Sequence, residues 1–172
     1  MPEDGVTALV VPLPEADRLL AAVAARFPDA VRPVPAHVSL LYPFVPAEAL
    51  DDRVLAALAE VFAGQPRFGV ELGECRRAGG FVSLRPTPED GFTALTGRIR
   101  RRWPDLLPYG GRFGSDVEPH LTVALNTSDE TAAAVEREIV PEFAPIRAEV
   151  GEAWLIGFQG GWELRRRFDF TG

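Results

Sequence analysis

Hydrophobic and polar positions alternate strictly in two tetrapeptides of this chain, residues 37–40 (HVSL) and residues 120–123 (HLTV). Each has the order histidine, apolar residue, hydroxyl residue, apolar residue. In a β-strand successive side chains point to opposite faces, so the histidine and the hydroxyl residue share one face. The apolar residues then point to the other face, towards a core. Each tetrapeptide therefore predicts a strand that presents an imidazole beside a hydroxyl group.

The rest of the pattern predicts strands that alternate with helices. Short apolar or alternating runs bounded by Pro and Gly are typical of strands, and apolar residues three and four positions apart are typical of helices. The predicted strands span residues 5–13, 37–42, 66–76, 81–85, 119–125, 145–156 and 162–170. The predicted helices begin near Pro14, Ala47, Thr87 and Ser128 and end near Pro28, Gly64, Pro104 and Ile139.

This order of elements occurs twice. Residues 5–76 and residues 80–157 each contain a strand, a helix, a connection, a histidine strand, a second helix and a strand, and a closing strand follows at 162–170. An internal duplication explains the agreement; the alternative is chance, because any chain of alternating helices and strands can be laid over itself.

We therefore expect residues 1–172 to form a single bilobal domain of the α/β (α+β) class. Its duplicated strand-helix-strand-helix-strand units would be related by a pseudo-twofold axis. Mainly antiparallel sheets would flank a central cleft, where the two histidine strands face each other.

The composition is that of an ordinary soluble globular protein. The chain has 172 residues, of which 47% are hydrophobic and 25% charged, which is enough apolar material for a sizeable core. The formal net charge of −7 argues against binding of long duplex nucleic acid, which needs a basic surface. A small nucleotide or the end of an RNA strand is still compatible with this charge.

Cysteine content and the amino terminus point to the cytoplasm. The single cysteine, Cys75, cannot form an internal disulfide, which fits a reducing compartment. No run approaches the ~20 apolar residues of a membrane span, and the acidic start of the chain lacks the basic region of a signal peptide. We expect a cytoplasmic protein without a membrane partner and, by default, a monomer.

Two histidines that face one substrate suit general acid–base catalysis. The unperturbed pKa of imidazole lies near ~6.5, so either protonation state is available near neutral pH. One of His37 and His120 would remove a proton from water, and the other would donate a proton to the departing oxygen. Attack and departure lie on opposite sides of phosphorus, so phosphoester cleavage needs this arrangement. Ser39 and Thr122 would hydrogen-bond the non-bridging oxygens, and no metal or other cofactor is required.

Other interpretations of the same residues have less support. A lone strand histidine is usually structural, but two in one pattern favour function. Zinc would need a third ligand, and although Asp116 and Glu118 lie near His120, no HExxH or paired-cysteine spacing is present. A Ser-His-Asp triad lacks its GxSxG turn, and no P-loop or GxGxxG supports ATP or dinucleotide binding.

A Gly-rich loop at residues 107–119 (LPYGGRFGSDVEP) precedes the second histidine strand. We predict a flexible segment beside the site. Its Arg112 and Phe113 could hold a phosphate and stack on a base. A solvated turn with one aromatic side chain tucked inward is an equally good interpretation.

The two tetrapeptides resemble the H-x-[ST]-x signature of the 2H phosphoesterase superfamily. The stretch 37–44 (HVSLLYPF) is especially similar to its bacterial branch of 2′-5′ RNA ligase-like, or RNA 2′,3′-cyclic phosphodiesterase, proteins. The similarity covers nearly the whole chain, through motif spacing, duplication and the closing strand pair. Ser39 stands where the family more often has Thr, which keeps the hydroxyl group.

The resemblance implies a bilobal fold with both motifs in a central cleft. It also implies metal-independent hydrolysis of 2′,3′-cyclic phosphates, or cleavage and joining of 2′-5′ linkages, in nucleotides or RNA ends. His37 and His120 would be the catalytic pair, and Ser39 and Thr122 the substrate-binding hydroxyl residues. The alternative is a non-catalytic module that uses the same cleft to bind an RNA end or a nucleotide.

Overall fold

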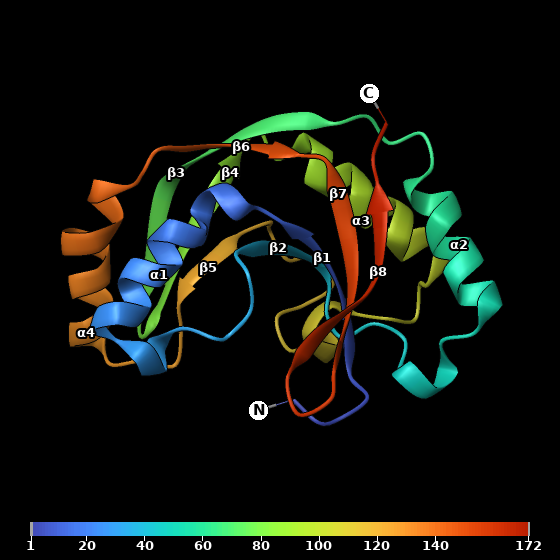
Figure 1. Ribbon diagram of the computed structural model, residues 1–172, viewed down its shortest axis with the longest axis horizontal. Helices are drawn as coiled ribbons and strands as arrows, with labels where there is room; N and C mark the ends of the chain where they lie inside the picture. The colour runs from blue at the N-terminus through green and yellow to red at the C-terminus, as the bar shows by residue number, and fades with distance from the viewer. Residues whose placement is uncertain (1, 172) are drawn as a thin grey trace.

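Both histidine tetrapeptides lie at the centre of one curled, eight-stranded antiparallel sheet (Figure 1). The computed structural model describes residues 2–171. The strand order is β6-β3-β4-β5-β2-β1-β7-β8, with β2 and β5 in the middle. The strands are β1 (Thr7–Pro12), β2 (His37–Leu41), β3 (Phe68–Ala78), β4 (Phe81–Thr87), β5 (Leu121–Ala124), β6 (Ile146–Val150), β7 (Glu152–Phe158) and β8 (Trp162–Asp169).

Four α-helices cover the sheet in two pairs. α1 and α4 lie together at one end of the molecule, and α2 and α3 at the other (Figure 1). The helices are α1 (Asp17–Arg26), α2 (Asp52–Phe62), α3 (Asp90–Arg102) and α4 (Asp129–Ala134), the last continued by a π-helical turn at Val135–Ile139. Short 3₁₀ turns occur at Pro14–Ala16, Pro28–Ala30, Ala47–Ala49, Pro108–Gly111 and Val140–Glu142.

Side-chain caps explain where two of these helices begin. The Asp51 carboxylate accepts a hydrogen bond from the backbone N–H of Val54 at 3.0 Å, at the start of α2. The Ser128 hydroxyl accepts from the N–H of Thr131, also at 3.0 Å, at the start of α4. Each cap satisfies one backbone donor that the first helical turn leaves free.

The main core lies between the helices and one face of the sheet. It contains the apolar residues that alternate with the histidines and hydroxyl residues, such as Val38 and Leu121, which are fully buried. A second, smaller cluster of Ala8, Val10 and Ile156 lies on the opposite face. The sheet therefore packs its helices on one side and leaves the side of the histidines for a site.

The third strand of each half pairs with the other half of the chain. β3 pairs with β4, and β7 pairs with β1. The order of strands is consequently symmetric about the contact between β2 and β5, which is what the proposed duplication would produce. Each side of the molecule is built from both halves of the sequence. The expected α+β class and antiparallel pairing are confirmed.

The prediction of one continuous strand at residues 145–156 is wrong. This segment is divided at Gly151 into β6, which pairs with β3, and β7, which pairs with β1 at the other end of the sheet. The Arg67 guanidinium packs against Gly151 at this turn, so a larger residue there would require the exposed end of the Arg67 side chain to move. The carbonyl of Gly151 also accepts from the N–H of Phe170 at 2.9 Å.

No helix within residues 2–171 combines the length and apolar character that crossing a membrane would require.

Candidate active site

The register between β2 and β5 brings the four predicted site residues together. Val38 pairs with Leu121 in antiparallel fashion. His37 is therefore opposite Thr122, and Ser39 is opposite His120, because partner numbers in an antiparallel pair have a constant sum. Directly opposite side chains lie on one face of a sheet. Each imidazole thus has the hydroxyl residue of the other tetrapeptide beside it.

All four residues line one cavity of about 610 Å³. Each of the four is partly exposed, whereas their neighbours Val38 and Leu121 are buried. Aromatic side chains form much of the remaining wall: Tyr42, Phe81, Tyr109, Phe113 and Trp162. The cavity therefore combines a small polar centre with apolar walls, as is usual for sites that bind small organic ligands.

Both imidazoles are held in the same way. Nδ1 of His37 donates to the carbonyl oxygen of Pro35 at 2.8 Å, and Nδ1 of His120 donates to the carbonyl oxygen of Glu118 at 3.0 Å. A carbonyl oxygen can only accept, so Nδ1 carries the proton in each ring. Nε2 of both histidines is consequently left as the group that can take up or, when protonated, release a proton.

Burial lowers the pKa of His37 below its ordinary value of 6.5. The positive charges of His120 and Arg32 lower it further, while the hydrogen bond to Pro35 acts in the opposite direction. His37 is therefore neutral at pH 7, which is the state in which Nε2 can accept a proton.

This shift predicts a pH dependence of stability. The unfolded chain protonates His37 near pH ~6.5, whereas the folded protein protonates it only at lower pH, so acidification favours unfolding. We expect the thermal midpoint of the wild type to fall between pH 7 and pH 5 by more than that of His37→Gln. Scanning calorimetry of both proteins measures this difference, and equal falls would contradict the lowered pKa.

Hydrogen bonds fix the segment before each histidine, and the sequence did not predict these bonds. The Asp17 carboxylate accepts from the N–H of Ala36 at 2.8 Å, directly before β2. Before β5, the carboxylate of Glu118 accepts from Arg85 Nη1 at 2.6 Å. The Arg85 side chain is only 8% exposed and also pairs with Glu89. Arg85 thus anchors the residue whose carbonyl orients His120.

Tyr109 was not predicted as a site residue, although it lies in the Gly-rich loop predicted to flank the site. Its backbone has a φ of 54°, a left-handed conformation that is uncommon outside glycine. Its N–H donates to the carbonyl of Tyr42, which ties the loop to the end of β2. Burial raises the pKa of the Tyr109 phenol, and the Ser39 hydroxyl opposes that rise. Tyr109 therefore reaches the polar centre of the cavity.

The two loop residues considered from the sequence have different positions. Phe113 is 65% exposed, lines the cavity and packs edge-on against Tyr109 with ring centroids 5.6 Å apart. Arg112 is not part of the cavity lining, and its guanidinium lies 5.7 Å from the Phe113 ring centroid. Only the aromatic member of the pair is therefore placed to contact a ligand in this cavity.

The acidic residues near His120 do not assemble into a set of metal ligands. Glu118 is held by Arg85 and also lies 3.4 Å from Arg76. Within the described part of the chain, residues 2–171, no three His, Cys, Asp or Glu side chains are grouped as potential ligands of a metal ion.

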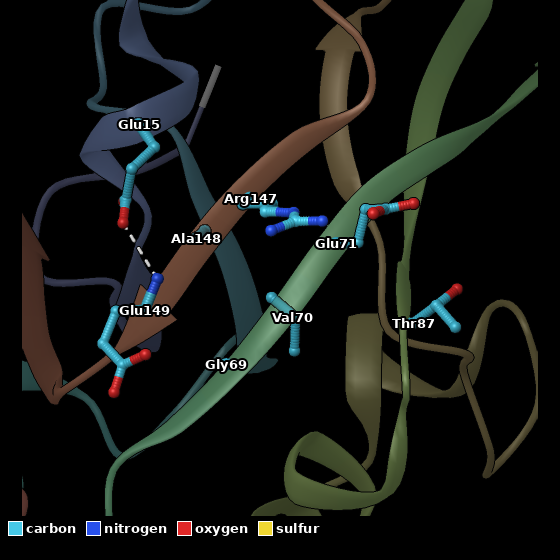
Figure 2. Close-up of a pocket in the computed structure, with 8 residues that line it drawn as sticks. All are labelled: Glu15, Gly69, Val70, Glu71, Thr87, Arg147, Ala148 and Glu149. Carbon is cyan, nitrogen blue, oxygen red and sulfur yellow. Dashed lines mark hydrogen bonds between the residues drawn. The ribbon is translucent and has the colours of Figure 1, made fainter.

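A second hollow lies at the β6 edge of the sheet (Figure 2). The side chain of Arg147 on β6 points towards Glu71 on β3, and Glu15 accepts from the N–H of Glu149 at 2.8 Å. None of the four predicted site residues lines this hollow. Its exposed side chains, including Thr87, therefore provide controls for substitutions in the cavity at the histidines.

Comparison with known proteins places these features in context. The family model described as the 2′-5′ RNA ligase superfamily matches residues 11–162. Among solved structures, Escherichia coli LigT complexed with ATP has a TM-score of 0.64 at 21% identity, covering 99% of this chain and 100% of that one. LigT complexed with 3′-AMP has a TM-score of 0.63 at 22% identity, with the same coverage.

The protein TT0787 of Thermus thermophilus is similar as well. Its TM-score is 0.64 at 20% identity, with 97% of this chain and 98% of that chain covered. No curated protein matches the sequence. The similarity to the solved structures thus concerns the fold along almost the entire chain.

Proposed function

Because the chain belongs to the 2′-5′ RNA ligase superfamily, which matches it over residues 11–162, we propose that it is a metal-independent phosphodiesterase. The proposed substrates are 2′,3′-cyclic phosphates, or 2′-5′ linkages, of nucleotides or RNA ends. The resemblance to 2H phosphoesterases expected from the tetrapeptides is confirmed by this match. The observation that carries the proposal is the pairing of Val38 with Leu121, whose register puts each histidine opposite a hydroxyl residue in one cavity.

In the proposed reaction, water attacks phosphorus on one side while a ribose oxygen leaves on the other. Neutral His37 accepts the water proton at Nε2, a role favoured by its lowered pKa. Protonated His120 donates a proton from Nε2 to the leaving oxygen. His37 takes up one proton and His120 releases one, so His37 ends the step protonated and His120 ends it neutral. Proton exchange with solvent restores the starting states.

The hydroxyl groups of Ser39 and Thr122 would act on the non-bridging oxygens. In the register of β2 and β5, Ser39 lies opposite His120 and Thr122 lies opposite His37. Negative charge grows on these oxygens in the transition state, and fixed donors in a partly desolvated cavity stabilise it. This arrangement explains why a hydroxyl residue follows each histidine at the second position.

Aromatic walls and nucleotide complexes of similar folds support a nucleotide as substrate. LigT has been crystallised with ATP and with 3′-AMP. In this chain the exposed ring of Phe113 and the ring of Trp162 line the cavity around the histidines. Base–aromatic stacking tolerates every base, so these walls suit a nucleoside without selecting one base.

We expect purified protein to hydrolyse adenosine 2′,3′-cyclic phosphate in the presence of EDTA. The rate should follow a bell-shaped pH profile, because one histidine must be neutral and the other protonated. Chromatography of the products measures the rate and identifies the isomer. Binding of the nucleotide without turnover across cyclic and 2′-5′ substrates would instead support the non-catalytic module. Loss of activity in EDTA, restored by a divalent metal, would contradict the metal-independent mechanism.

A further inference from the structure

A row of side chains crosses the sheet from the active site to the β8 edge. Ser39 pairs with Val10, Val10 with Trp154, and Trp154 with Arg167, on strands β2, β1, β7 and β8. Directly opposite residues share a face, so this row continues the face that carries the histidines. With neighbouring strands ~4.8 Å apart, Arg167 begins roughly 14 Å from Ser39.

Within residues 2–171, this part of the sheet is apolar and separate from the main core that the helices cover. Ala8, Val10 and Ile156 form a hydrophobic cluster separate from the main core, and Leu164 beside Ile156 is 46% exposed. Ala8, Val10 and Ile156 are themselves buried and packed against Val34, Tyr42, Trp154 and Trp162. The accessible part of this face is therefore formed by partly buried side chains such as Trp154 and by Leu164.

A groove of about 170 Å³ adjoins the cavity that contains the histidines. The groove and the cavity share Val10, Val34, His37, Ile156 and Trp162. The groove alone is lined by Pro35, Trp154, Glu163 and Leu164. A chain bound at the histidines can therefore continue along the groove without leaving the protein surface.

Trp154 and Arg167 are held as one unit beside the groove. The carboxylate of Glu152 accepts from Trp154 Nε1 at 3.1 Å and pairs with Arg167 Nε at 3.3 Å. The Arg167 guanidinium lies 5.8 Å from the Trp154 ring centroid. Its side chain is about half exposed, and a guanidinium has five donors, so other nitrogen atoms can contact an anion.

An aromatic ring beside a cation is the combination by which proteins hold single-stranded nucleic acid, through stacking of a base and contact with a phosphate. We infer that the groove binds a second nucleotide, the one that precedes the nucleotide carrying the reacting phosphate. Its base stacks on Trp154 and its phosphate contacts Arg167. The inference rests on the proposed function and narrows it, since the preferred substrate is an RNA end of two or more nucleotides.

The test compares a mononucleotide with a dinucleotide, both ending in a 2′,3′-cyclic phosphate. The wild type is expected to have a kcat/KM at least about tenfold higher for the dinucleotide. Trp154→Ala and Arg167→Ala should lower this ratio towards one. Trp154→Phe keeps an aromatic ring and should retain most of the preference. Arg147→Ala, which removes an exposed arginine at the opposite edge of the sheet (Figure 2), is the matched control and should leave the ratio unchanged.

Binding is measured in parallel by calorimetry, because it does not depend on turnover. A dinucleotide 3′-phosphate should bind the wild type at least about tenfold more tightly than a 3′-mononucleotide, and Trp154→Ala should remove the difference. Equal values for both ligands, or a preference that survives Trp154→Ala and Arg167→Ala, would overturn the inference. Tighter binding of the dinucleotide than of the mononucleotide, without hydrolysis of either substrate, would overturn the proposed function but support the second subsite.

Discussion

Replacing either His37 or His120 with alanine is expected to lower the turnover of 2′,3′-cyclic nucleotides by about 10²–10⁴-fold. The physical reason is that Nε2 of each ring is the free proton-transfer atom, while Nδ1 is committed to a backbone carbonyl. The loss in the double variant should be much smaller than the product of the two single losses, because both rings serve one transition state. Single-turnover kinetics with saturating enzyme measure the chemical step directly.

The fold should survive these substitutions. Both histidines are partly exposed, and their buried neighbours on β2 and β5 supply the packing. Thermal unfolding of the variants at pH 8 is therefore expected to resemble that of the wild type. Hydrolysis of the cyclic nucleotide at the wild-type rate by both single variants would end the proposal.

A leaving group that needs no proton separates the roles of the two histidines. With a phosphodiester of 4-nitrophenol, loss of the general acid matters little, whereas loss of the base remains costly. If His37 is the base, His120→Ala should regain most of its activity on this substrate and His37→Ala should not. The reverse result would assign the base to His120 despite the lowered pKa of His37.

Removing either hydroxyl group is expected to have the next largest effect. Ser39→Ala and Thr122→Val should each lower kcat by about 10²-fold, the lower end of the range seen when one donor to a developing oxyanion is lost. KM should change little if the hydrogen bond strengthens only in the transition state. Steady-state kinetics on a cyclic nucleotide measure both parameters.

Conservative exchanges and a remote substitution control this experiment. Ser39→Thr and Thr122→Ser keep the hydroxyl group and should retain most of the activity. Thr87→Val removes a threonine hydroxyl on β4 at the hollow of Figure 2, away from the histidines, and should leave kcat unchanged. Equal kcat values for Thr122→Val and the wild type would show that Thr122 does not act on the phosphate.

The sequence predicted local structure well because the information is local. Strict alternation around His37 and His120 identifies the two central strands and the face that each side chain occupies. Pro, Gly and the capping residue Ser128 locate most helix ends within a few positions, whereas α2 begins at Asp52 and not near Ala47 as predicted. The pairing of two similar tetrapeptides was enough to propose the polar centre of the site.

Features that depend on contacts between distant segments could not be predicted. β3 and β4 form a local hairpin across Gly79-Gly80, but no sequence pattern indicates that β7 pairs with β1. The hydrogen bond from Arg85 to Glu118 joins residues whose proximity exists only in the folded sheet. Tyr109 lies in a loop noted for its glycines, and neither its left-handed backbone nor its place in the cavity lining is indicated by the local sequence.

The exchange of strands between the halves has a consequence for biosynthesis. β1 and β2 leave the ribosome before β7, so β1 gains its second neighbour only when residues 152–158 emerge. Until then one side of this apolar strand has no partner, and unpaired edges of this kind favour aggregation of nascent chains. His37, on the strand next to β1, is therefore synthesised well before β1 acquires its second neighbour.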